Sequence, residues 1–123
     1  MPILLSGENE LRSCLVVESD SRKDVEDRFE DVYRYLQRLQ PHEEEPMMNL
    51  IAYVEDNNYV LHIFPRKAHR PRQYYLEGKE QLLISPGAID MAGLIITVRE
   101  EDFKKIGKED IEDIYFQVSL PVL

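Results

Sequence analysis

An apolar run that ends at a proline and passes directly into a cationic segment is the strongest constraint on the fold, between Tyr59 and Tyr75. Alternate side chains of a strand point to opposite faces, and both sets from Tyr59 to Phe64 are largely apolar. This pattern predicts a central strand that is covered on both sides. Pro65 has no amide hydrogen for a ladder and is expected to end the strand. Five basic residues follow within seven positions: Arg66, Lys67, His69, Arg70 and Arg72.

These five basic residues contrast with the rest of the chain, because the formal net charge is -9. Guanidinium groups match pairs of anionic oxygens, so the segment is the candidate site for a small ligand that carries a phosphate or a carboxylate. Nucleic acid and anionic membranes need a broad basic surface, so neither is expected as a partner. The alternative is that the segment only neutralises acidic neighbours such as Glu43, Glu44 and Glu45.

The length of 123 residues fits a single domain, 1–123, in which about 1–12 are expected to be a loosely ordered lead-in. Cys14 is the single cysteine and lies in an apolar run, so we expect a buried core thiol. The apolar opening is too short for a signal peptide, and no apolar run is long enough to cross a bilayer. These features are typical of a cytoplasmic protein.

Local signals place two helical regions. Ser21, with Asp24 three residues later, resembles a capping box, and apolar residues recur at helical spacing until Pro41, which predicts a long helix from Ser21 to Leu39. Near the C-terminus, Gly107 separates two short helices, 99–106 and 108–118. We expect their apolar side chains to face the core: Phe103, Ile106, Ile111, Ile114, Tyr115 and Val118.

Five segments are predicted to be strands: 13–18, 47–55, 59–64, 81–84 and 89–98. Asp56, Asn57 and Asn58 are good turn residues, so the second and third segments should form a hairpin. Within the last segment, Asp90 has two interpretations, a buried carboxylate paired with Arg66 or Arg70, or an exposed residue at the strand entrance. Hairpins together with grouped helices predict an α+β fold with a mainly antiparallel sheet, one long helix and short C-terminal helices packed on it.

Four segments form an ordered series: 48–53, 60–69, 84–96 and 101–103. The series resembles the C-terminal half of the nucleotidyltransferase branch of the histidine-triad superfamily, which includes diadenosine tetraphosphate phosphorylase (ATP adenylyltransferase), GDP-galactose phosphorylase and uncharacterised bacterial relatives. The similarity spans about 48–120. It implies a histidine-triad-like half, and it implies that the strand end at Pro65 and Arg66 faces the nucleotide or sugar-phosphate side of an active site.

The resemblance also implies nucleotidyl transfer through a covalent nucleotidyl-histidine, which a His-x-His-x-His or His-x-His-x-Gln strand supplies in the other half of such enzymes. This chain lacks that motif, since Ile63 and Phe64 follow His62. No catalytic residue or cofactor is therefore expected here. No metal site is expected either, because the three histidines, at 42, 62 and 69, do not have a metal-binding spacing. The implied partner is the N-terminal half of the same enzyme, or further copies of the chain in a homo-oligomer.

Two other functions stay open. The first is a non-catalytic binding or regulatory module that keeps a histidine-triad-like fold. The second is a hydrolase that uses His62 or His69, although no oriented base or second acid is evident beside either residue. His62 lies mid-strand among apolar residues, and we expect it to be a hydrogen-bonded core histidine.

Overall fold

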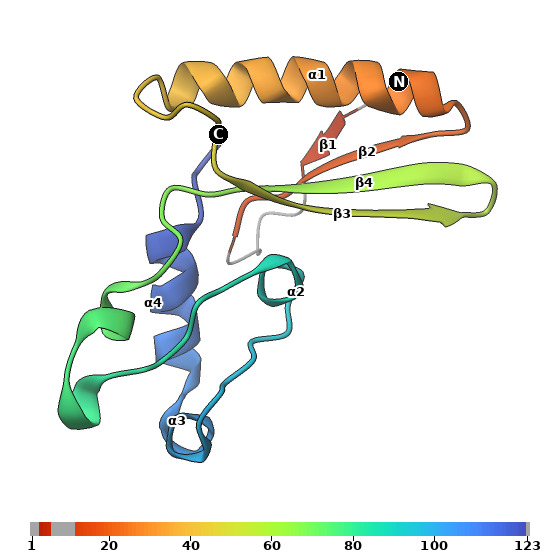
Figure 1. Ribbon diagram of the computed structural model, residues 1–123. Coiled ribbons are helices and arrows are strands. Elements are labelled where there is room, and N and C mark those ends of the chain that lie inside the picture. Colours follow the sequence, from red (N-terminus) through yellow and green to blue (C-terminus); the bar gives the residue numbers. More distant parts are fainter. Residues whose placement is uncertain (1–2, 6–11, 123) are drawn as a thin grey trace.

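The computed structural model describes residues 3–5 and 12–122, and it is an α+β fold built on a four-stranded antiparallel sheet (Figure 1). The strand order is β1-β2-β4-β3. The strands are β1 (Ile3–Leu5), β2 (Leu15–Ser19), β3 (Met48–Glu55) and β4 (Asn58–Pro65). The predicted α+β class and the antiparallel pairing of 48–54 with 59–64 are confirmed, and β4 lies between two neighbours as its two apolar faces predict.

The long helix α1 (Arg22–Leu39) lies across one face of this sheet (Figure 1). It begins where predicted, because Ser21 is the N-cap and its side chain accepts a hydrogen bond from the amide of Asp24 at 3.3 Å. Val32 and Leu36 are buried against the inward residues of β2 and β4, which are Leu15, Val17, Leu61 and Ile63. Hydrophobic burial on this side thus joins the helix to the two central strands.

The β3–β4 hairpin closes over two residues with left-handed backbone conformations, Asp56 (φ 50°) and Asn57 (φ 66°). Two consecutive positive φ values are typical of a type I′ turn, whose twist matches that of the flanking strands. The turn fixes the register from Glu55 opposite Asn58 to Met48 opposite Pro65. That register places the end of β4 beside the start of β3.

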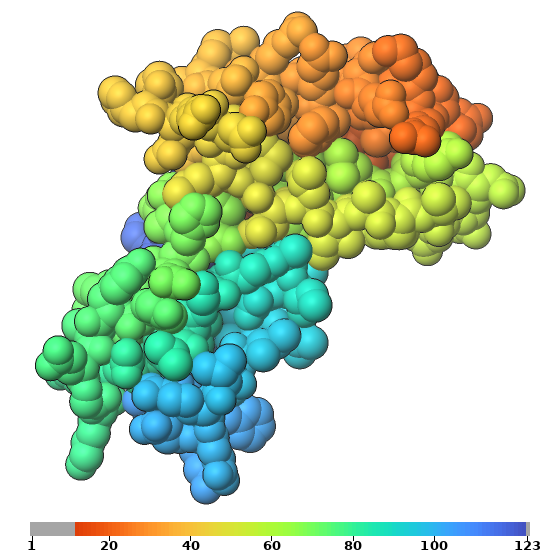
Figure 2. All heavy atoms as spheres, viewed as in Figure 1, coloured from red at the N-terminus to blue at the C-terminus, as the bar shows by residue number. Residues whose placement is uncertain are grey.

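The remaining chain forms a second body that extends from the end of β4 (Figure 2). It contains two short 3-10 turns, Arg72–Tyr75 and Gly78–Glu80, followed by α2 (Ala88–Met91), α3 (Glu100–Lys105) and α4 (Lys108–Val118). Gly107 separates α3 from α4 as predicted, and its amide donates to Asp110 at 2.8 Å. Ile114, Tyr115 and Val118 on α4 are buried as expected.

Two predicted strands, 81–84 and 89–98, are wrong. Residues 81–84 have no strand pairing, and the amide of Ile84 donates to the carbonyl of Leu82 at 2.9 Å within the segment; residues 88–91 form α2. Asp90 explains why 89–98 is not a strand. Its carboxylate accepts hydrogen bonds from the amides of Gly87 (2.9 Å) and Ile96 (3.0 Å), and these bonds stabilise a turn. Gly93 (φ 123°) completes this turn in a conformation that favours glycine. Asp90 is 7% exposed, so the interpretation as a buried carboxylate is confirmed, but the hydrogen-bond partners of that carboxylate within 12–122 are backbone amides and not Arg66 or Arg70.

Two smaller predictions also need correction. Phe103 is 73% exposed, and the buried residue of α3 is its neighbour Asp102. The lead-in is not wholly irregular, because Ile3–Leu5 pairs with β2. The rest of the predicted lead-in, apart from Arg12, lies outside the described residues.

Candidate functional site

Arg66 stands directly after β4 and is 2% exposed. Its Nε donates to the carbonyl of Val118 at 3.3 Å. Its Nη1 donates to the side-chain oxygen of Asn49 and to the carbonyl of Pro86 (2.9 Å). Its Nη2 donates to the carbonyls of Ala68 (3.0 Å) and His69 (2.9 Å). An arginine side chain has five N–H donors, and these bonds use all of them.

The geometry gives Arg66 a structural position and does not support the predicted contact between its side chain and a phosphate. Burial lowers the pKa of the Arg66 guanidinium, and the nearby carboxylate of Asp90 acts in the opposite direction. The charge stays, because an arginine is not deprotonated in proteins. A buried charge of this kind is tolerated only while its acceptors remain in place.

The four other basic residues of the segment, which we call the basic loop (Lys67 to Arg72), are exposed. The Arg70 guanidinium lies 4.2 Å from the centroid of the Tyr74 ring, and its Nε donates to the hydroxyl of Ser85 at 3.2 Å. The Lys67 ammonium lies 4.9 Å from the centroid of the Phe116 ring. Each aromatic contact places the charged group of a basic side chain against a ring without neutralising its charge.

Arg72 differs from its neighbours, because it lies 3.7 Å from the carboxylate of Asp113. Its charge is therefore partly balanced within the second body. Glu43, Glu44 and Glu45, which were the expected partners if the loop only neutralises acids, take part in no ion pair across the described range 12–122. Lys67, His69 and Arg70 are the members of the predicted site that the structure leaves most available.

A cavity beside the basic loop does not add to that site. Its volume is about 470 Å³, and its charged lining contains three basic and three acidic residues: Arg72, Lys79, Lys105, Glu80, Asp110 and Asp113. Balanced charges give an anion no net attraction. The loop alone thus remains the candidate for phosphate binding.

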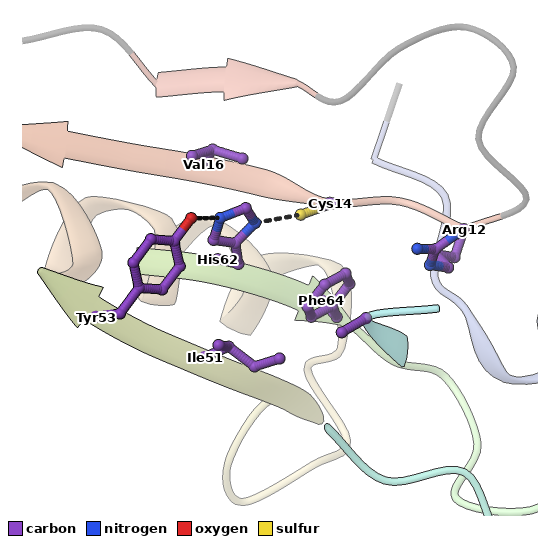
Figure 3. A pocket seen from close by; sticks show the side chains of 8 residues that line it. Arg12, Cys14, Val16, Ile51, Tyr53, His62 and Phe64 are labelled. Atoms are coloured by element: carbon purple, nitrogen blue, oxygen red, sulfur yellow. Dashed lines mark hydrogen bonds between the residues drawn. The ribbon is translucent and has the colours of Figure 1, made fainter. Parts of the chain in front are cut away.

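A second cavity, of about 340 Å³, lies on the face of the sheet opposite α1 (Figure 3). Alternation along the strands explains its lining, since Val16 and His62 point away from the side that packs on the helix. Its lining also includes Ala92 at the C-terminal end of α2 and two residues that precede β2, Arg12 and Cys14. The lining residues are Arg12, Cys14, Val16, Ile51, Tyr53, His62, Phe64 and Ala92.

Three polar side chains meet in this cavity. His62 Nδ1 lies 3.7 Å from the sulfur of Cys14, and Nε2 lies 2.9 Å from the hydroxyl of Tyr53 (Figure 3). The ring of His62 is stacked on that of Tyr53, with centroids 5.6 Å apart and planes 23° apart. The predicted hydrogen bonding of His62 is confirmed, but its position in the core is not, because the side chain is only partly buried and lines the cavity. The predicted burial of Cys14, which is 6% exposed, is confirmed.

Sequence reasoning considered these residues separately and missed that they meet. The available signal was strand parity: Cys14 and Val16 share one face of their strand, and His62 and Phe64 share one face of theirs. Whether these faces form one cavity depends on which strands are neighbours in the sheet. Val16 pairs with His62 on one side, and Ile51 pairs with His62 on the other. Within residues 12–122, no group of three or more His, Cys, Asp or Glu could hold a metal ion.

Comparisons with protein-family models, curated proteins and solved structures found no match for this chain. Among the described helices, none combines the length and the apolar character that crossing a membrane requires.

Proposed function

We propose that this chain is the substrate-contacting part of a nucleotidyltransferase-like or phosphorylase-like protein and that it binds a nucleotide or sugar phosphate through the basic loop. Alone it performs no nucleotidyl transfer. The observation that carries the proposal is the difference in burial within the segment. Arg66 is buried and binds the backbone of the loop, whereas Lys67 and Arg70 are exposed on its surface.

The loop is held at several points, which favours binding. The amide of Lys67 donates to the carbonyl of Val118 at 2.9 Å, and the amide of Arg72 donates to the side chain of Gln117 at 2.6 Å. Between them, Arg66 binds the carbonyls of Ala68 and His69. A loop already ordered in its bound shape loses less conformational entropy when a ligand arrives.

The charges on the loop suit an anion. Only the Nε of Arg70 has an acceptor within residues 12–122, the hydroxyl of Ser85, so its two terminal nitrogens can form a fork toward two phosphate oxygens. Lys67 adds a second charge three positions earlier, and His69 lies between them. Because the rest of the chain is acidic, this local patch favours a small anionic ligand over a nucleic acid.

The assignment to a nucleotidyltransferase rests on the order of the motifs. Two of them, 48–53 and 60–64, lie on neighbouring strands and lead into the loop, which fits the resemblance. The third, 84–96, departs from it, because the resemblance implies a strand and the chain forms α2 and an extended segment. The proposal of phosphate binding therefore rests on the basic loop, and the proposed class of reaction rests on the order of the motifs.

Calorimetry at low ionic strength tests this function, with a nucleoside triphosphate, a nucleoside diphosphate sugar and a hexose phosphate as probes. Charge-assisted contacts contribute about 1.5 to 3 kcal/mol each, so Lys67→Ala or Arg70→Ala should weaken binding by roughly ten- to a hundredfold. Lys23→Ala and Arg22→Ala are matched controls, since both residues are exposed on α1 and pair with acids one turn away. Absence of binding by the unaltered chain, or unchanged affinity in both loop variants, contradicts the proposal.

A further inference from the structure

The cavity that Cys14, His62 and Tyr53 share has no role in phosphate binding by the loop. None of the basic residues 66–72 is among the residues that line it. Its lining is mainly apolar, from Val16, Ile51, Phe64 and Ala92, with three polar groups in contact on one wall (Figure 3). A thiol, an imidazole and a phenol in a row are chemically competent in a way that a buried thiol by itself is not.

We propose that Cys14 is a nucleophilic thiol activated by His62, and that the cavity is a modification site for small uncharged electrophiles such as α,β-unsaturated carbonyl compounds. Three observations carry this: the 3.7 Å approach of His62 Nδ1 to the Cys14 sulfur, the 2.9 Å contact of His62 Nε2 with Tyr53, and the 340 Å³ of space beside them. The site is independent of the function proposed for the basic loop.

The Tyr53 hydroxyl supplies an acceptor for the tautomer that the reaction needs. When Nε2–H donates to the phenol oxygen, Nδ1 presents its lone pair to the thiol, and this is the tautomer in which the imidazole acts as a base. Stacking of the two rings holds the imidazole plane in place. The carbonyl of Leu15 lies farther from the sulfur, at 3.9 Å, than His62 Nδ1 does at 3.7 Å. Tyr53 is thus a positioning residue, and Cys14 and His62 are the reacting pair.

The reaction is an addition in which no group leaves. The Cys14 proton moves to His62 Nδ1, the sulfur forms a bond to the β-carbon of the unsaturated carbonyl, and the electrons of the carbon–carbon double bond move toward the carbonyl oxygen. The proton on His62 then passes to the α-carbon, and neutral imidazole is restored. The product mass equals that of the protein plus the whole electrophile.

Other charged and titratable side chains lie at this cavity or pack beside it. Arg12, which precedes β2, lies with its guanidinium 5.2 Å from the ring centroid of Tyr115 on α4, and its Nε donates to the carbonyl of Met91 in α2. Tyr115 packs in the same cluster as Cys14 and donates its hydroxyl to the carbonyl of Asp90 at 2.5 Å. A positive charge at the cavity wall favours a thiolate there, whereas the apolar lining disfavours it.

The pH dependence of alkylation by N-ethylmaleimide tests the proposal, with intact mass as the readout. Cys14 is the sole cysteine in the sequence, so one adduct has one location, and the same chain unfolded in urea provides the thiol without its neighbours. At pH 7 the folded chain should react about tenfold faster than the unfolded chain, and its rate should reach half-maximum at a lower pH. His62→Phe keeps the ring and its packing, and it should abolish both differences.

Tyr53→Phe should reduce the rate less and move the pH of half-maximal rate toward that of His62→Phe, while Tyr59→Phe on the same hairpin should change neither. If His62→Phe does not fold by circular dichroism, the Tyr53→Phe result decides. The proposal is wrong if the folded thiol reacts no faster than the unfolded one at pH 7, or if the folded variants have the profile of the unaltered chain.

Discussion

Arg99 and Asp102 form a two-point ion pair, in which the guanidinium Nε and Nη2 each lie 2.8 Å from a different carboxylate oxygen of Asp102. The Asp102 side chain is fully buried, and it also accepts a hydrogen bond from the amide of Leu83 at 3.2 Å. The pair therefore joins α3 to residues 81–83, which precede α2. Hydrogen bonding to Arg99 lowers the pKa of the Asp102 carboxyl, while burial acts in the opposite direction.

The lowered pKa predicts that Asp102 makes stability depend on pH at the acidic end. An unfolded aspartate has a pKa of about 3.9, so the carboxylate contributes its full stabilisation above that pH and loses it as pH falls through the lower, folded value. Urea unfolding measured from about pH 6 to pH 2 should show this loss. Asp102→Asn should be less stable at neutral pH by about 3 to 5 kcal/mol and should show a flatter acidic limb.

Asp27→Asn is the matched control for that series, since Asp27 is exposed and pairs with Lys23 at 2.8 Å. Its cost should stay within about 1 kcal/mol at every pH. A free energy of unfolding for Asp102→Asn that equals that of Asp27→Asn would show that the buried pair contributes nothing to the acidic limb.

Replacement of Arg66 should act on stability. Arg66→Ala leaves five acceptors without their donor, and breaking a buried charged network costs about 3 to 5 kcal/mol. Arg66→Lys keeps the charge but has three donors in place of five, so it should lose a large part of the same stability. Equilibrium unfolding in urea measures the loss of stability in both variants.

Arg72→Ala is the control variant, and it should cost less than about 1 kcal/mol because the ion pair of Arg72 is exposed. A loss under that value for Arg66→Ala would refute the structural role.

Core truncations should separate the buried from the exposed aromatic and aliphatic residues. Ile63→Ala should cost on the order of 3 kcal/mol, since Ile63 is fully buried on the face of the sheet that packs against α1. Phe29→Ala should approach that value because Phe29 packs on the same cluster. Phe103→Ala should change the free energy of unfolding by no more than about 0.5 kcal/mol. Thermal or urea unfolding distinguishes them, and equal losses at Ile63 and Phe103 would contradict the described packing.

The isolated chain should form no covalent nucleotidyl adduct and should not cleave dinucleoside polyphosphates. The nucleophile of the implied reaction belongs to a paired-histidine strand that the sequence lacks, and both ring nitrogens of His62 already have neighbours within the described residues. The assay incubates the chain with a nucleoside triphosphate, quenches it and records the intact mass. An adduct on the unaltered chain that vanishes in His62→Ala or His69→Ala would overturn the prediction.

Local signals in the sequence sufficed for the parts of the fold that local interactions determine. Ser21 and the helical spacing after it predicted α1, and the turn residues at Asp56 and Asn57 predicted the hairpin. The segment 89–98 has an equally clear strand pattern, and Leu94, Ile96 and Val98 are indeed exposed on alternate positions. It lacks a neighbouring strand within the described residues, because the Asp90 carboxylate binds two amides and turns the chain there. Tertiary context overrides propensity in such cases.

The candidate site shows the same limit. Charge pattern identified the basic loop, but a count of cations does not distinguish Arg66 from Arg70, since both are arginines of one short segment. The distinction depends on where carbonyl groups from 49–118 converge, which is a property of the folded chain. The cavity around His62 depends likewise on the order of strands in the sheet, which a sequence pattern leaves open.

The five-point attachment of Arg66 affects how a mutational scan of the loop should be read. In a growth or pull-down screen, any substitution at Arg66 would lower the amount of folded protein, and the screen would score it as the strongest binding defect of the segment. Lys67 and Arg70, which are exposed and which the proposal assigns to ligand binding, would score lower. Dividing each score by protein abundance reverses that ranking, so the abundance of each variant is the quantity to record first.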